Sequence, residues 1–124
     1  MAANSITVSF SLNGAVAATQ TVARPATGTT STVNFDSLPA GALTVTATAY
    51  PTTTGSGVAQ ASASDTVTIT AGQSTPVALT MASTINSVAL TPAGPNVAVG
   101  ATTTLTGTGY NTSNSIVLNS SSTL

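Results

Sequence analysis

Charge is what this sequence most lacks. Among 124 residues only Arg24, Asp36 and Asp65 carry a formal charge, which is 2% of the chain, where soluble domains have roughly a quarter. One arginine cannot make the several phosphate contacts that nucleic-acid binding needs, so we expect no nucleic-acid partner. Such a surface also lacks the repulsion that keeps copies of a protein apart. The composition therefore favours a protein that tolerates or requires self-association.

The chain also has no His, Cys, Lys, Glu or Trp. Without them no ordinary general base, activated nucleophile or zinc site can be assembled, so we expect neither an enzyme nor a cofactor. Asp36 precedes a turn and Asp65 begins an expected strand, and both positions suit an Asp that hydrogen-bonds backbone groups. A calcium site built from one Asp and loop carbonyls is the less favoured alternative.

Long apolar runs are missing as well, because Ser or Thr interrupts each of them. No window approaches the roughly 20 apolar residues of a membrane-spanning helix, so we expect no membrane insertion. The opening "MAANSITV" lacks the basic and apolar regions of a signal peptide. Two interpretations stay open: Met1 begins a trimmed exported chain, or it is the natural start of a cytoplasmic or phage-borne one. The absence of cysteine fits an exported bacterial protein, and we expect an extracellular or cell-surface location.

What the chain does have is alternation of apolar with hydroxyl residues. In "ITVSFSL" (6–12) and "ALTVTATAY" (42–50) every second residue is apolar, which is typical of half-buried strands. "NG" at 13–14 predicts a tight hairpin. Further strands are expected at 17–23, 32–35, 58–63, 65–70 and 74–81. About seven short strands in some 80 residues predict an all-β fold, with an immunoglobulin-like antiparallel β-sandwich over residues 4–82.

A second module is expected over residues 83–124. Strand-like segments there include "INSVALTP", "VAVG", "TTTLTGTGY" and "SIVL". Roughly 40 residues is near the size below which a domain seldom stands alone without disulfides or metals. Its opening nevertheless repeats the first module: "GALTVTATAY" (41–50) and "GATTTLTGTGY" (100–110) both begin with Gly-Ala and end in Tyr before a polar loop.

The second module resembles the first half of bacterial Ig-like domains of group 2. Those open with an "I-x-x-V-x-L-x-P" strand and continue through "V-x-V-G-x-T-x-x-L-x-A-x-x-Y". The matching positions here are Ile85, Val88, Leu90, Pro92, Val97, Val99, Gly100, Leu105 and Tyr110, while the later "W-x-S-S" strand has no counterpart. Residues 4–82, with "FDSLPAG" and "VTITAGQSTPVALTM", look similar to Ig-like or carboxypeptidase-regulatory-like modules of secreted bacterial proteins. The resemblance implies stalks, adhesin segments and assembly units.

These observations predict a non-enzymatic structural subunit of a bacterial surface fibre, filament or surface layer, assembled through β-strand contacts between copies. We expect the second module to be an incomplete Ig-like module, completed by a neighbouring chain or by sequence outside these 124 residues. The apolar residues expected to form its assembly surface are Val88, Leu90, Val97, Val99, Leu105, Ile116 and Leu118.

The alternative is an adhesin or carbohydrate-binding module taken from a larger secreted protein. Sugar binding needs an exposed aromatic ring, and the alternation places Phe10 and Phe35 inward. Tyr50 and Tyr110 have outward parity at strand ends, so they are the candidates for stacking on a sugar. A tyrosine that packs on its own loop is the more common arrangement at such positions.

Overall fold

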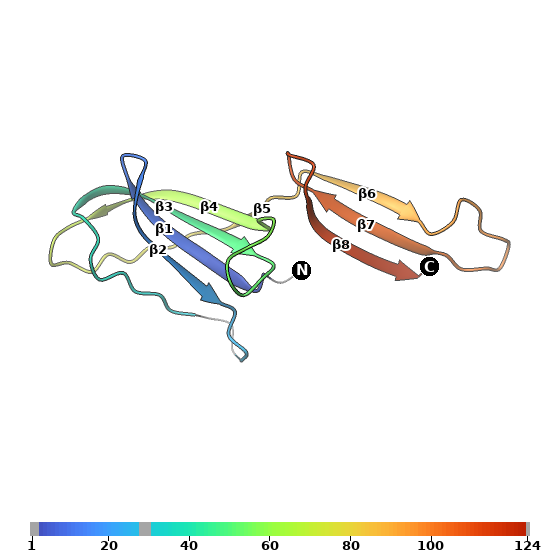
Figure 1. Ribbon diagram of the computed structural model, residues 1–124, viewed down its shortest axis with the longest axis horizontal. Helices are drawn as coiled ribbons and strands as arrows, with labels where there is room; N and C mark the ends of the chain where they lie inside the picture. The colour runs from blue at the N-terminus through green and yellow to red at the C-terminus, as the bar shows by residue number, and fades with distance from the viewer. Residues whose placement is uncertain (1–2, 28–30, 124) are drawn as a thin grey trace. The chain divides into compact units, whose positions relative to one another are not determined.

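The structure is a computed structural model that describes residues 3–27 and 31–123. These residues form β-strands and connecting segments, with no helix among them. The strands are β1 (Ser5–Leu12), β2 (Ala15–Ala23), β3 (Gly41–Tyr50), β4 (Ala61–Ile69), β5 (Ala82–Ser83), β6 (Ser87–Pro92), β7 (Thr104–Tyr110) and β8 (Ile116–Thr123). All pair antiparallel, in two sheets, which confirms the all-β class (Figure 1). The immunoglobulin-like topology stays a prediction.

The chain divides into two compact units between Ser83 and Thr84. The first unit holds a five-stranded sheet in the order β2-β1-β3-β4-β5. The second unit holds a three-stranded sheet in the order β6-β7-β8. Each unit therefore has its own sheet with its own free edges.

The core of the first unit follows from the alternation in β3. Leu43, Val45, Ala47 and Ala49 are each at most 5% exposed, as their parity predicts. The register places Phe10 of β1 opposite Val45. Side chains directly opposite each other in an antiparallel pair share a face, so the apolar sides of the strands form one continuous layer.

Two irregular segments cover this layer. Phe35 and Leu38 from 31–40, and Leu79 from 70–81, pack against the core residues, and the rings of Phe10 and Phe35 meet edge to face at 4.9 Å. We expected strands at 32–35 and 74–81, and this was wrong, because neither segment pairs with a strand and both are irregular (Figure 1). A side chain connects the 31–40 segment to the sheet, because Gln20 Nε2 of β2 donates to the carbonyl oxygen of Asn34 (2.7 Å).

The fourth strand differs from expectation in another way. We expected separate strands at 58–63 and 65–70, whereas β4 is continuous and pairs with β3 along its whole length. Asp65 therefore lies within a strand rather than at its start, and its Oδ1 accepts the backbone N–H of Thr66 (2.8 Å). The long partner β3 holds the weak "ASAS" portion in the extended conformation.

The tight turn between β1 and β2 confirms the hairpin that "NG" predicts. Asn13 and Gly14 both have positive φ, at 51° and 82°. This is the backbone geometry of a type I′ turn, which matches the twist of the flanking strands. The turn sets β2 as the outermost strand beside β1.

On the opposite face of the first sheet, the loop at 51–58 folds back over β1. Ser5 is 2% exposed; its Oγ donates to the carbonyl oxygen of Thr52 (2.7 Å) and accepts the N–H of Gly55 (3.1 Å). Gly55 has φ of 74°, and a Cβ there would lie 2.7 Å from Oγ1 of Thr7. The loop thus needs a glycine to approach the sheet and a buried hydroxyl to hold it.

Replacing the most buried side chain should destabilise the first unit. Leu43 is 0% exposed, so Leu43→Ala should lower the free energy of unfolding by about 2–5 kcal/mol. The control Val16→Ala removes a side chain that is 67% exposed and should change it by less than about 0.5 kcal/mol. Urea unfolding followed by circular dichroism measures both. Equal effects would contradict the position of the core.

Removing the Ser5 hydroxyl should release the 51–58 loop. In Ser5→Ala the N–H of Gly55 and the carbonyl of Thr52 lose their buried partner, which should cost about 1–3 kcal/mol. Hydrogen exchange at the Gly55 amide should accelerate accordingly. Ser9→Ala is the matched control, because the Ser9 hydroxyl bonds only the Thr19 hydroxyl outside the loop (2.8 Å). Unchanged exchange at Gly55 would show that the hydroxyl does not hold the loop.

Candidate assembly surface

The two units share a local plan. In the first unit Ser5 lies opposite Tyr50, and the N–H of Asn4 donates to the carbonyl oxygen of Tyr50 (2.8 Å). In the second unit Ser87 lies opposite Tyr110, and the N–H of Asn86 donates to the carbonyl oxygen of Tyr110 (2.7 Å). Thus β6 corresponds to β1 and β7 to β3. The strand β8 corresponds to β4, because each comes next in the chain after the tyrosine that ends the preceding strand.

One strand of the first unit has no counterpart in the second. In the first unit β2 pairs with the outer edge of β1, whereas in the second sheet β6 is itself an edge strand. The chain runs from β6 to β7 through the connection 93–103, which contains no strand. The outer edge of β6 is therefore unpaired within its own sheet.

One face of the second sheet is apolar, and two of the β7 positions on that face are glycines. Val88 lies opposite Gly109 and Leu90 opposite Gly107, so their side chains share a face with Leu105 and Leu118. A Cβ at Gly107 would meet Cδ2 of Leu90 at 3.5 Å. A Cβ at Gly109 would meet Cδ1 of Ile85 at 3.1 Å. The side chains of Leu90 and Ile85 therefore pack against Gly107 and Gly109 of β7, respectively.

This apolar face remains accessible at β6. Val88 is 65% exposed and Leu90 70% exposed, while Leu105 and Leu118 are half-buried. In the first unit the corresponding apolar face is covered by the irregular segments 31–40 and 70–81. A sheet with one apolar face needs a covering layer to be stable.

The other residues of the expected assembly surface lie elsewhere in the unit. Val97 and Val99 are in the connection 93–103, at 49% and 108% exposure, where we had expected a strand. Ile116 is opposite Tyr110, because the register shifts between Gly109 and Tyr110 and so moves Ile116 to the other face. The structure therefore brings together four of the seven: Val88, Leu90, Leu105 and Leu118.

The expected assembly surface left out two apolar residues of this unit. Val117 is buried at 6% exposure and lies at the register shift, between Ile116, which is opposite Tyr110, and Leu118, which is opposite Gly109. Ile85 precedes β6 and covers Gly109. The glycine alternation in "TGTGY" was the available signal for Ile85, since glycines in a strand mark places where something approaches closely.

The charged residues are confined to the first unit. Arg24 directly follows β2, and Asp65 lies opposite Val45 on the apolar face of β4. Asp65 is exposed and lies in the part of β4 that β5 does not pair, and a charge on a sheet edge is one of the devices by which proteins prevent edge-to-edge association. Residues 84–124 contain no charged residue, so β6 and β8 lack that protection.

Tyr50 and Tyr110 end β3 and β7 of different units, and both are half-buried. Each has a polar loop beside it. In the second unit Asn111 Oδ1 accepts the N–H groups of Ser113 (3.0 Å) and Ser115 (2.9 Å), which shapes the loop after Tyr110. Sugar stacking by either tyrosine stays a prediction.

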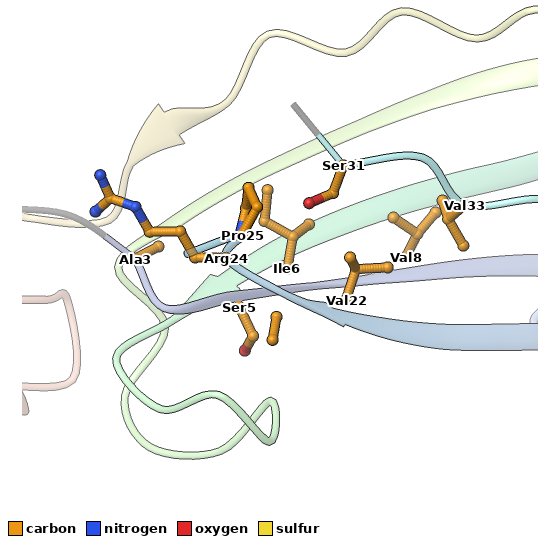
Figure 2. Close-up of a pocket in the computed structure, with 10 residues that line it drawn as sticks. Ala3, Ser5, Ile6, Val8, Val22, Arg24, Pro25, Ser31 and Val33 are labelled. Atoms are coloured by element: carbon orange, nitrogen blue, oxygen red, sulfur yellow. The ribbon is translucent and has the colours of Figure 1, made fainter. Parts of the chain in front are cut away.

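An apolar pocket of about 470 Å³ lies on the inner face of the first sheet. Figure 2 shows Val8, Val22 and Val33 toward one end, Ile6 between, and Arg24 with Ala3 at the other end. Ser5 points to the opposite side of the strand, as alternation requires. The pocket combines apolar walls with the single cationic side chain of the chain.

No family model matches the sequence, and neither the curated proteins nor the solved structures include a match. Within residues 3–27 and 31–123 there is no helix long and apolar enough to cross a membrane. The same residues contain no group of three or more acidic, His or Cys side chains placed to hold a metal ion.

Proposed function

We propose that this protein is a non-enzymatic structural subunit that self-assembles through β-strand contacts, in a fibre, filament or layer on a bacterial surface. The observation that carries the proposal is the second sheet, because among the residues that the structure describes in this unit none forms a layer over its apolar face or pairs with its outer edge. The resemblance to bacterial Ig-like domains supports the extracellular setting.

The physical driving force is apolar burial together with backbone hydrogen bonding. Val88 and Leu90 are mostly exposed, and each stands to gain roughly 1.5–3 kcal/mol on full burial. Pairing of an open strand edge adds backbone hydrogen bonds to that gain. With a formal net charge of −1, copies of the chain repel one another very little.

The full chain should self-associate, and its association should respond to salt as an apolar contact does. Raising sodium chloride from low to moderate concentration should change the association constant little, because few charges are present to be screened. Sodium sulfate should strengthen association, since it promotes apolar burial. Sedimentation velocity over a wide concentration range, with electron microscopy of the largest species, measures this. A monodisperse monomer at every concentration would refute the proposal.

A second candidate function is a binding module, favoured by the pocket beside Arg24. Its apolar walls with one guanidinium suit a ligand with an apolar chain and an anionic head. This chemistry differs from that of a sugar site, which needs an aromatic platform.

Binding of a medium-chain carboxylate tests this second candidate. Decanoate should shift the NMR signals of Ile6, Val8, Val22 and Val33, which line the pocket. Arg24→Gln should weaken decanoate binding by about fivefold, as expected for one exposed ion pair, and leave decanol binding unchanged. Absence of binding, or shifts confined to other residues, would remove this candidate.

A further inference from the structure

The direction of the backbone groups on β6 decides which strand its open edge can accept. The N–H of Ala93 donates to the carbonyl oxygen of Thr104 (2.8 Å). Hydrogen-bonded pairs alternate along an antiparallel ladder, so Ser87, Ala89 and Thr91 direct their N–H and C=O groups toward β7. Val88 and Leu90 direct theirs toward the open edge.

The partner strand must then place apolar side chains beside Val88 and Leu90. Residues paired across an antiparallel ladder share a face, and a register slip of one residue reverses all of them. In the partner strand, the residues whose N–H and C=O groups point toward β6 must therefore also have apolar side chains. This requirement discriminates among the free edges of the chain.

Three other edges fail it. On β4, which β5 pairs only at Ala61 and Ser62, the outward-directed positions beyond β5 are Ser64, Thr66 and Thr68, all with hydroxyl side chains. On β2 the N–H of Arg24 donates to Asn4 (2.7 Å), so the outward-directed positions are Thr19, Thr21 and Ala23, on the hydroxyl-bearing face. On β8 the outward-directed positions include Asn119, which also lies on the hydroxyl side opposite Thr108. Each of these strands would put polar side chains beside the apolar face of β6.

The strand that meets the requirement is β6 itself. We propose that β6 pairs antiparallel with β6 of a second copy around a two-fold axis, so that the two apolar faces become one continuous six-stranded surface. This pairing rests on the proposed self-assembly and identifies the contact, or joint, through which two copies associate. In a two-fold contact the same patch serves both copies, so Val88 and Leu90 lie beside each other's counterparts.

The register follows from which groups are available. Centring the pair on Ala89 sets Val88 against Leu90 of the second copy and satisfies the outward N–H and C=O groups of both residues in both copies. Centring on Leu90 sets Val88 against Pro92, which has no N–H to donate. Centring on Val88 sets Leu90 against Asn86, whose N–H is already donated to Tyr110. Ala89 is therefore the centre.

Single cysteines test the register, because the chain has none of its own. In Ala89→Cys the two sulfur-bearing residues face each other at a non-hydrogen-bonded pair, where Cα atoms are about 4.5 Å apart. Mild oxidation should therefore link most of the protein as dimers. Thr91→Cys is the matched control on the same strand face; its two copies would lie about 13 Å apart and should not link.

Proline tests the edge independently of the register. Val88→Pro removes an outward N–H, a change that edge strands tolerate, and should weaken dimerisation by about tenfold or more. Val88→Thr keeps the N–H and the branched shape and should stay within about threefold of the unaltered chain. Asn119→Pro removes the outward N–H on β8 and should also leave dimerisation intact. Circular dichroism checks that each variant is folded, and sedimentation equilibrium measures the constants.

The outcomes separate this joint from the general proposal. If the unaltered chain assembles but Val88→Pro assembles equally well, the β6 joint is wrong and self-assembly stands. If Asn119→Pro abolishes assembly while Val88→Pro does not, β8 is the joint. Linking of Thr91→Cys without Ala89→Cys overturns the proposed register. An unaltered chain that stays monomeric at all concentrations overturns the joint and the proposed function together.

Discussion

The constraint on which the rest of this structure depends is that a sheet with one apolar face must have that face covered. In the first unit β3 presents Leu43 and Val45, and the covering groups Phe35, Leu38 and Leu79 come from irregular segments. These segments bury the centre of the layer and leave an open pocket of about 840 Å³ along it. The second unit has the same kind of apolar face at β6, and its described residues, 84–123, include no segment that covers this face.

Alternation of apolar and hydroxyl residues made much of this fold predictable. It identified the strands β1 and β3, the inward side chains of β3, and the inward placement of Phe10 and Phe35. The turn at Asn13 and Gly14 was predictable because its residues tolerate positive φ. These features depend on local chemistry, which a single sequence displays directly.

The features that sequence reasoning missed depend on partners distant in the chain. "STPVALTM" alternates like a strand but is irregular in the structure, where Leu79 packs against the core instead of the backbone joining the sheet. The bulge opposite Tyr110 moves Ile116 to the other face, and alternation alone cannot reveal an inserted residue. For the same reason only part of the expected assembly surface lies on one face.

A two-fold joint at β6 closes after two copies, so a fibre needs a second joint of a different kind. One candidate is β2, an uncharged edge strand of the other unit that directs Thr19, Thr21 and Ala23 outward. A joint there would gain backbone hydrogen bonds with little apolar burial, because its outward-directed side chains are small or polar. Since the β6 joint adds apolar contacts between Val88 and Leu90 of the two copies to its backbone hydrogen bonds, it should form at lower protein concentration than any β2 joint. Assembly would then proceed from dimers to longer chains as concentration rises.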